Sequence, residues 1–217
     1  MIKKVITLSL LALLSNNVYS YDLPKIGNDK SSASSGNIET DVGEFIKKSS
    51  DLADIANKSL VAINSAFSTE EQIAAKKAEL AKIDGITDPK EKQAAQAKLN
   101  KSESAEAEKN LKSADAAEKI KSLSAEKQKK VGKAIFNFGV AALQAPTLID
   151  KGQKIVSGAS IANALKIVPV KDAIPLLQRF ISDGAGTVAG FAKLAKGANI
   201  AVPEVTSSSQ ADSNIEI

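Results

Sequence analysis

The sequence predicts an all-α protein, and three observations favour that class. Apolar residues make up 43% of the chain but aromatic residues only 4%, so a sheet sandwich or an aromatic-centred core is not expected. Alanine, lysine and glutamate, which favour helices, dominate the middle of the chain. Apolar residues also recur at helical spacing between residues that typically begin or end helices. We expect elongated amphipathic helices over residues 39–123, followed by a compact bundle of shorter apolar helices over residues 124–203.

The first twenty residues have the composition of a secretory signal peptide. Lys3 and Lys4 form a basic start, residues 5–14 are an apolar run, and Ser20 ends a cleavage site of small residues. The apolar run is too short to span a bilayer. We therefore expect removal of residues 1–20 and a periplasmic or secreted location. Residues 21–38, rich in serine and glycine, are expected to be a disordered linker.

A first amphipathic helix is expected from residue 39 to about residue 67. Its apolar stripe recurs every seven residues and includes the polar Ser49. Because the stripe covers fewer than four heptads and contains this serine, we expect it to pack on the chain's own core. A homodimeric coiled coil stays open as the alternative.

The next helix is expected to begin after Ser68 and to end at Gly85. Ser68 and Glu71 have the spacing of a capping box, in which the serine hydroxyl accepts from a free amide of the first turn. Glycine often ends helices because it adopts the left-handed conformation without a steric penalty. We therefore predict that Gly85 has a positive φ angle.

A further helix is expected from Pro89 to about Leu123. Asp88 is placed to cap it, and proline is favoured at the first helical position. Its apolar stripe consists mostly of alanines, whose burial stabilises a helix much less than burial of leucines. Residues 39–123 should thus form a solvated helical arm rich in lysine, glutamate and alanine.

Most of the large apolar side chains follow Ser124, which is placed to cap a helix. Glycines and prolines are expected to divide this region into short helices, over about residues 125–146, 148–156, 161–168, 172–181 and 186–196. Their apolar side chains should form the compact helical core of the protein, residues 124–203. The acidic, serine-rich tail, residues 204–217, is expected to be disordered.

The positive charge of the chain is local. The formal net charge is +4, but residues 39–130 carry equal numbers of acids and bases, and the surplus falls in residues 131–203. That surplus is mostly lysine, which is strongly hydrated, and it is not interleaved with aromatic residues. The usual means of base recognition are missing, so we predict no nucleic-acid partner.

Several chemistries are disfavoured by composition. The chain contains no cysteine, histidine or tryptophan, so it has neither disulfides nor the usual zinc ligands, nucleophiles and bases. Most carboxylates fall beside lysines on solvated helical faces, and no calcium loop or glycine-rich phosphate loop is present. We predict a protein without enzymatic activity, cofactor or metal.

Two short patterns resemble functional motifs. Ser124 and Lys127 match the Ser-x-x-Lys pattern of serine acylases, but the companion motif is missing and a helix cap explains the serine. Gly186 and Gly190 have the Gly-x-x-x-Gly spacing of closely packed membrane helices. Lysines interrupt that segment, so we expect tight packing within a soluble bundle instead.

Two functions remain for a chain of this kind. The leading hypothesis is a non-catalytic exported interaction or accessory protein, with a protein of the cell envelope or secreted fraction as its partner. The alternative is a carrier of an apolar ligand such as a lipid, or a protein that binds membranes reversibly. That alternative rests on large apolar side chains that would line a ligand site or else belong to an ordinary core: Phe136, Phe138, Leu176, Leu177, Phe180 and Phe191.

Overall fold

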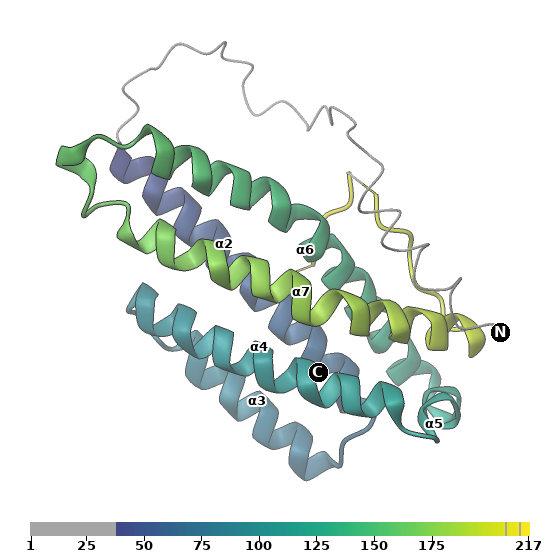
Figure 1. Ribbon diagram of the computed structural model, residues 1–217. Helices are drawn as coiled ribbons and strands as arrows, with labels where there is room; N and C mark the ends of the chain where they lie inside the picture. Colours follow the sequence, from purple (N-terminus) through teal and green to yellow (C-terminus); the bar gives the residue numbers. More distant parts are fainter. Residues whose placement is uncertain (1–37, 207, 213) are drawn as a thin grey trace. The chain divides into compact units, whose positions relative to one another are not determined.

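Six α-helices carry most of the described chain (Figure 1). The computed structural model describes residues 38–206, 208–212 and 214–217, and this part contains no β-strand. The elements are α2 (Ile38–Ser65), α3 (Glu70–Asp84), α4 (Pro89–Lys112), α5 (Ala116–Ser122), α6 (Ala125–Gly158), the 3-10 turn η1 (Ile161–Asn163) and α7 (Val168–Gly197). The all-α prediction is confirmed. The predicted signal peptide, residues 1–20, and nearly all of the predicted linker lie outside the described residues.

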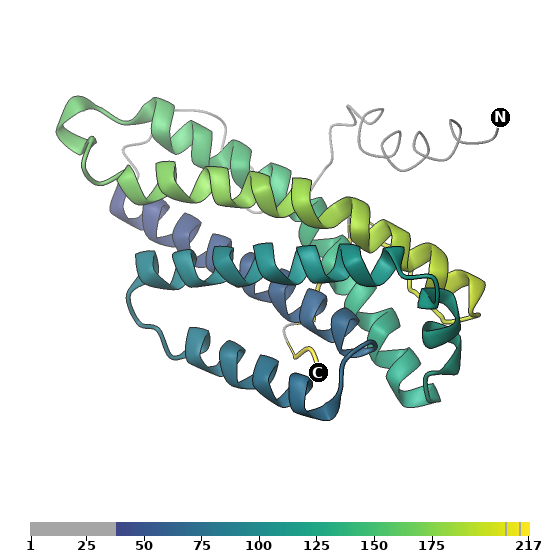
Figure 2. The same ribbon diagram turned by 60° about the horizontal axis from the view of Figure 1, so that its bottom comes forward.

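The centre of the bundle is formed by α2, α6 and α7. Helices α4 and α6 lie on opposite sides of the α2–α7 pair, and α3 lies outermost next to α4 (Figures 1 and 2). All three central helices supply buried side chains to the main hydrophobic cluster, among them Phe45, Leu60, Phe138, Val170 and Phe191. The expected division into an extended arm and a separate compact core is therefore not confirmed. The apolar stripe of α2 is wide enough to make it a central helix.

The seam between α2 and α4 is polar and repeats every seven residues. Its members are Ser50, Asn57 and Asn64 on α2, and Gln96, Glu103 and Asn110 on α4. Asn57 Nδ2 donates to the main-chain oxygen of Gln96 at 3.0 Å, and Asn64 Nδ2 donates to that of Glu103 at 2.9 Å. The residue numbers of the bonded partners increase in the same direction along both helices, so the helices run parallel. Since α4 has mostly alanine for apolar contact, these buried bonds fix its register.

A single lysine ties the outer helix α3 to α4. Ile73, Leu80 and Ile83 give α3 a narrow apolar face. Between them lies Lys76, whose side chain is only 9% exposed and pairs with the carboxylates of Glu103 and Glu106. Because the apolar face of α3 is narrow, these ion pairs contribute much of the interaction that holds α3 in place.

Two of the predicted helix starts are confirmed. Asp88 accepts a hydrogen bond from the amide of Glu91 at 2.8 Å, and Ser124 accepts one from the amide of Lys127 at 3.3 Å. The helix predicted to reach Leu123 is interrupted, because residues 113–115 separate α4 from α5.

The predicted limits of α3 are wrong in detail. The capping box is formed by Thr69 and Gln72, one residue later than the predicted pair of Ser68 and Glu71. The hydroxyl of Ser68 instead donates to a main-chain oxygen of α2. Gly85 has a φ of −76°, in the right-handed region, so glycine is not needed there for its left-handed conformation.

The prediction of short helices after Ser124 is wrong at both prolines. Helix α6 continues through Pro146 to Gly158, and α7 continues through Pro175 to Gly197. An interior proline costs a helix about 3 kcal/mol. Both prolines are exposed, and the apolar residues before and after them belong to the same core cluster, so packing outweighs the lost hydrogen bonds.

The acidic tail, predicted to be disordered, lies on α6 in the residues that the structure describes. The buried side chain of Asn137 accepts from the amide of Asp212 at 3.0 Å and donates to its carbonyl at 3.3 Å. Lys133 pairs with the Asp212 carboxylate at 2.6 Å, and this bond, helped by the amide of Asn214, lowers the pKa of Asp212. Ile217 packs against the core. The buried side-chain amide of Asn137 bonds both the N–H and the carbonyl of Asp212, which explains why this serine-rich segment is held on α6.

The glycines of α7 differ in how closely other helices approach them. A Cβ atom at Gly184 would overlap the ring of Phe138, and one at Gly190 would overlap the side chain of Leu111. Nothing lies within 4 Å of a Cβ atom at Gly186. Tight packing is therefore confirmed for Gly190 but not for Gly186.

Alanine substitutions at two of these glycines should have opposite effects. Gly184→Ala is expected to lower the free energy of unfolding by about 1 to 3 kcal/mol, because the buried Phe138 ring has no room to move. Gly186→Ala is expected to raise it by about 0.5 to 1 kcal/mol through helix propensity alone. Urea denaturation of both variants measures these changes. Equal effects at the two sites would contradict the packing of α6 on α7.

Candidate functional site

A cavity of about 370 Å³ opens between α2, α4 and α7. One wall is apolar and comes from α7, with Leu176, Leu177 and Phe180. The opposite wall carries side-chain amides from α2 and α4: Asn57, Gln93, Gln96 and Asn100. Its volume is at the small end of the range for ligand sites, about 300 to 1,000 Å³. The cavity offers an apolar surface and a polar surface to one occupant.

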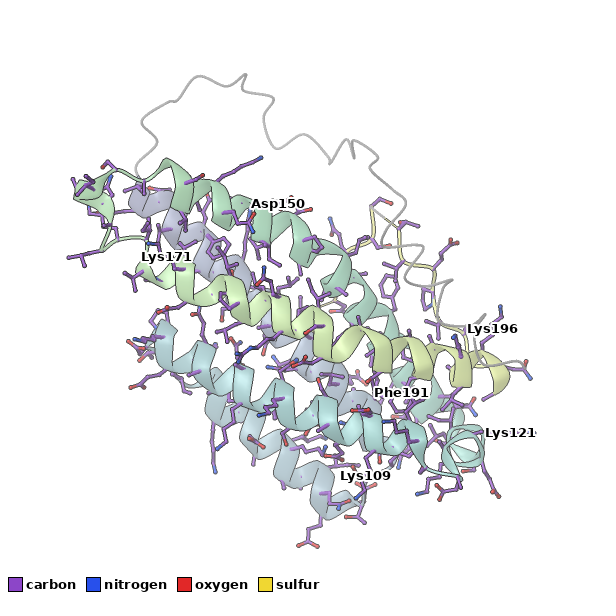
Figure 3. The ribbon with its side chains drawn as sticks, in the orientation of Figure 1. Lys109, Lys121, Asp150, Lys171, Phe191 and Lys196 are labelled. Carbon is purple, nitrogen blue, oxygen red and sulfur yellow. The ribbon has the colours of Figure 1, made fainter. Side chains whose placement is uncertain are left out.

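The structure separates the six apolar candidates into three groups. Leu176, Leu177 and Phe180 line the cavity together. Phe138 and Phe191 are core residues, exposed by only 1% and 0%; Phe191 is labelled in Figure 3. The Phe138 ring lies 5.1 Å from that of Phe180, and the Phe191 ring lies 5.6 Å from that of Phe67. Phe136 is half-buried and does not line the cavity.

Most of the amide wall is used in bonds between helices. Asn100 Nδ2 donates to Asn57 Oδ1 at 3.0 Å, and Gln96 Nε2 donates to the main-chain oxygen of Ser50 at 3.1 Å. Gln93 differs. Its side chain is 8% exposed, and its Nε2 has no hydrogen-bond partner among the described residues. A buried donor without an acceptor costs about 1 to 3 kcal/mol, so the site favours an occupant that supplies an acceptor.

Charged side chains stand at the rim of the cavity. Lys101, Arg179 and Asp183 are exposed and line it. Asp183 Oδ1 accepts from the hydroxyl of Ser182 at 2.8 Å. Neither Lys101 nor Arg179 takes part in an ion pair within the described part of the chain. Two bases against one acid leave the rim with a net positive charge.

Comparison with known proteins gives no family. No family model, curated protein or solved structure matches this chain.

The sequence alone does not indicate the amide wall. A signal was present, because Gln93, Gln96 and Asn100 follow each other at three- and four-residue spacing on a predicted helix. Polar residues at that spacing look like a solvated face when the helix is considered alone. Only the pairing of α4 with α2 makes that face an interior one.

A second feature is the turn between α6 and α7. It presents three large apolar side chains to solvent: Ile161 at 97%, Leu165 at 87% and Val168 at 42% exposure. Ile167 and Val170 in the same segment are buried, which fixes the turn to the bundle. The prediction of an apolar helix over residues 161–168 within the core is wrong. The segment instead connects two antiparallel helices at the end of the bundle, near Lys171 in Figure 3.

The remaining motifs have structural roles in this arrangement. Ser124 accepts the cap bond already described, while Lys127 Nζ lies 3.6 Å from a carboxylate oxygen of Glu70. In the described residues, no group of three acidic side chains is arranged to hold a metal ion. No helix in that part of the chain is long and apolar enough to cross a membrane.

Proposed function

We propose that this chain is a non-catalytic exported interaction protein, periplasmic or secreted, that docks on an envelope or secreted protein partner through its α6–α7 turn. The observation that carries this proposal is the exposure of Ile161 and Leu165 at 97% and 87%. Single exposed apolar residues are ordinary on protein surfaces, but two large ones on one short turn are a typical binding feature. Buried Ile167 and Val170 hold the turn in place, so the two side chains are presented on a fixed support.

The charges around the turn are of both signs. Lys166 Nζ lies 2.8 Å from Glu39, and Lys151 Nζ lies 3.0 Å from Glu44. The start of α2 thus neutralises two bases near the turn, while Lys154 and Lys171, exposed beside it, carry no ion pair within the described residues. An apolar centre with a rim of mixed charge is the usual composition of a protein interface.

Removing the exposed apolar side chains should abolish partner binding and leave the fold unchanged. For the double variant Ile161→Ser, Leu165→Ser we expect at least a tenfold loss of cross-linked partner recovered from the native cell, with an unchanged melting temperature. The control is Leu143→Ser, which removes a 37% exposed leucine elsewhere on α6 and should retain binding. Docking on a protein would be contradicted if the double variant still recovered the partner in full. It would also be contradicted if the double variant lost only its binding to liposomes.

A carrier of an apolar ligand is the second candidate function, and the cavity between α2, α4 and α7 favours it specifically. It does not compete with the docking proposal, because the cavity and the exposed turn share no residue.

A further inference from the structure

We infer that the cavity between α2, α4 and α7 binds an elongated apolar acid that carries a second hydrogen-bond acceptor at the end away from its acidic group. The inference rests on the carrier function proposed for this cavity and is independent of the docking proposal. It rests on three features of the cavity: an apolar wall, a buried donor without a partner, and a cationic rim.

The apolar wall determines the middle of the ligand. Leu176, Leu177 and Phe180 of α7 line the cavity together with Ala53 of α2 and Ala97 of α4. No side chain among these five donates or accepts a hydrogen bond, so this stretch suits a hydrocarbon chain. The two alanines leave the width that such a chain needs.

Gln93 determines the acceptor. Gln93 lines the cavity, and its buried Nε2 lacks a partner within the described residues, whereas neighbouring Gln96 and Asn100 donate to α2. An amide donor is satisfied by a hydroxyl, ether or carbonyl oxygen. A ligand with such an oxygen would satisfy the one donor of this wall that the fold leaves unpaired.

The rim determines the charge. Lys101 and Arg179 carry no ion pair within the described chain, and Asp183 is the one acid that lines the cavity. Arginine binds carboxylates through two parallel hydrogen bonds. The acidic end of the ligand therefore belongs at this rim.

The spacing of the two polar ends determines the length. Gln93 and Lys101 are eight residues apart on α4, which corresponds to about 12 Å along the helix. Helix α7 packs against α4. On α7, Arg179 and Asp183 lie two to three turns after Ala173, and all three residues line the same cavity. An extended medium-length chain with oxygens at both ends matches this separation.

Binding of three ten-carbon probes to the full mature protein tests the inference. We expect 10-hydroxydecanoate to bind about tenfold more tightly than decanoate, and decanoate to bind more tightly than decanol, in isothermal titration calorimetry. Gln93→Leu should remove the preference for 10-hydroxydecanoate and leave decanoate binding unchanged. Arg179→Ala should weaken both acids by a similar factor and leave decanol binding unchanged.

The controls separate a built site from nonspecific uptake. Lys109→Ala removes a lysine of α4 (labelled in Figure 3) and should change no affinity, because Lys109 does not line the cavity. Arg179 is exposed, so its variant tests the rim without risk to folding. Absence of binding by all three probes overturns the inference. So does binding that neither Gln93→Leu nor Arg179→Ala changes.

Discussion

Replacing Lys76 with methionine is expected to lower the free energy of unfolding by about 3 to 5 kcal/mol. The Lys76 ammonium lies 2.8 Å from Glu103 and 2.7 Å from Glu106, and it is 9% exposed. Glu103 is only 3% exposed and its other main contact is the amide of Asn64. Loss of the lysine would leave a buried carboxylate without a counter-charge, which is far more costly than loss of an exposed ion pair. Chemical denaturation measures the change.

Two further variants show whether the cost comes from charge. Lys77→Met alters the exposed neighbour of Lys76 and should change stability by less than about 0.5 kcal/mol. Adding Glu103→Gln to Lys76→Met should recover most of the loss, because glutamine keeps an oxygen for Asn64 but carries no charge. If the double variant is no more stable than Lys76→Met, the lysine acts through packing and not through Glu103.

The second large effect is expected at Phe138. Phe138→Ala should destabilise the protein by about 3 to 5 kcal/mol, since the ring is 1% exposed, packs 5.1 Å from the ring of Phe180 and fills the space above Gly184. Thermal and chemical denaturation of the variant measure this loss. The empty space would lie where α6 and α7 meet.

Phe136 provides a matched control on the same helix. It is half-buried and two residues from Phe138, so Phe136→Ala should cost less than half as much. Equal losses for the two variants would show that α6 is rotated relative to the arrangement described above.

The sequence was sufficient for the helical class and for local signals. Asp88 and Ser124 cap helices as predicted, because a cap depends only on residues within one turn. The apolar stripe of α2 was also readable, since it is long and regular. The capping box of α3 was misplaced by one residue because Ser68 and Thr69 both match the pattern.

The helix limits after Ser124 were not predictable from local rules. Pro146 and Pro175 ordinarily end helices, and only the packing of α6 and α7 along their whole length explains why these continue. The packing of the acidic tail on α6 likewise depends on contacts between residues far apart in the sequence. Asn137 and Asp212 are 75 residues apart, so no local pattern connects them.

The candidate sites depended even more on contacts between distant helices. Leu176, Leu177 and Phe180 were identified as apolar candidates, but the amides that face them come from other helices. Ile161 and Leu165 were expected to be core residues, because composition does not reveal that their segment forms a turn at the end of the bundle. Whether an apolar residue is buried depends on what packs against it.

The most direct test of the proposed function is site-specific photo-cross-linking in the native cell. A benzophenone side chain at the position of Ile161 is compared with one at the position of Gln144, which is exposed on α6 away from the turn. We predict a discrete protein adduct from position 161 that is missing from position 144. The same adducts from both positions, or none from position 161, would contradict docking through the α6–α7 turn.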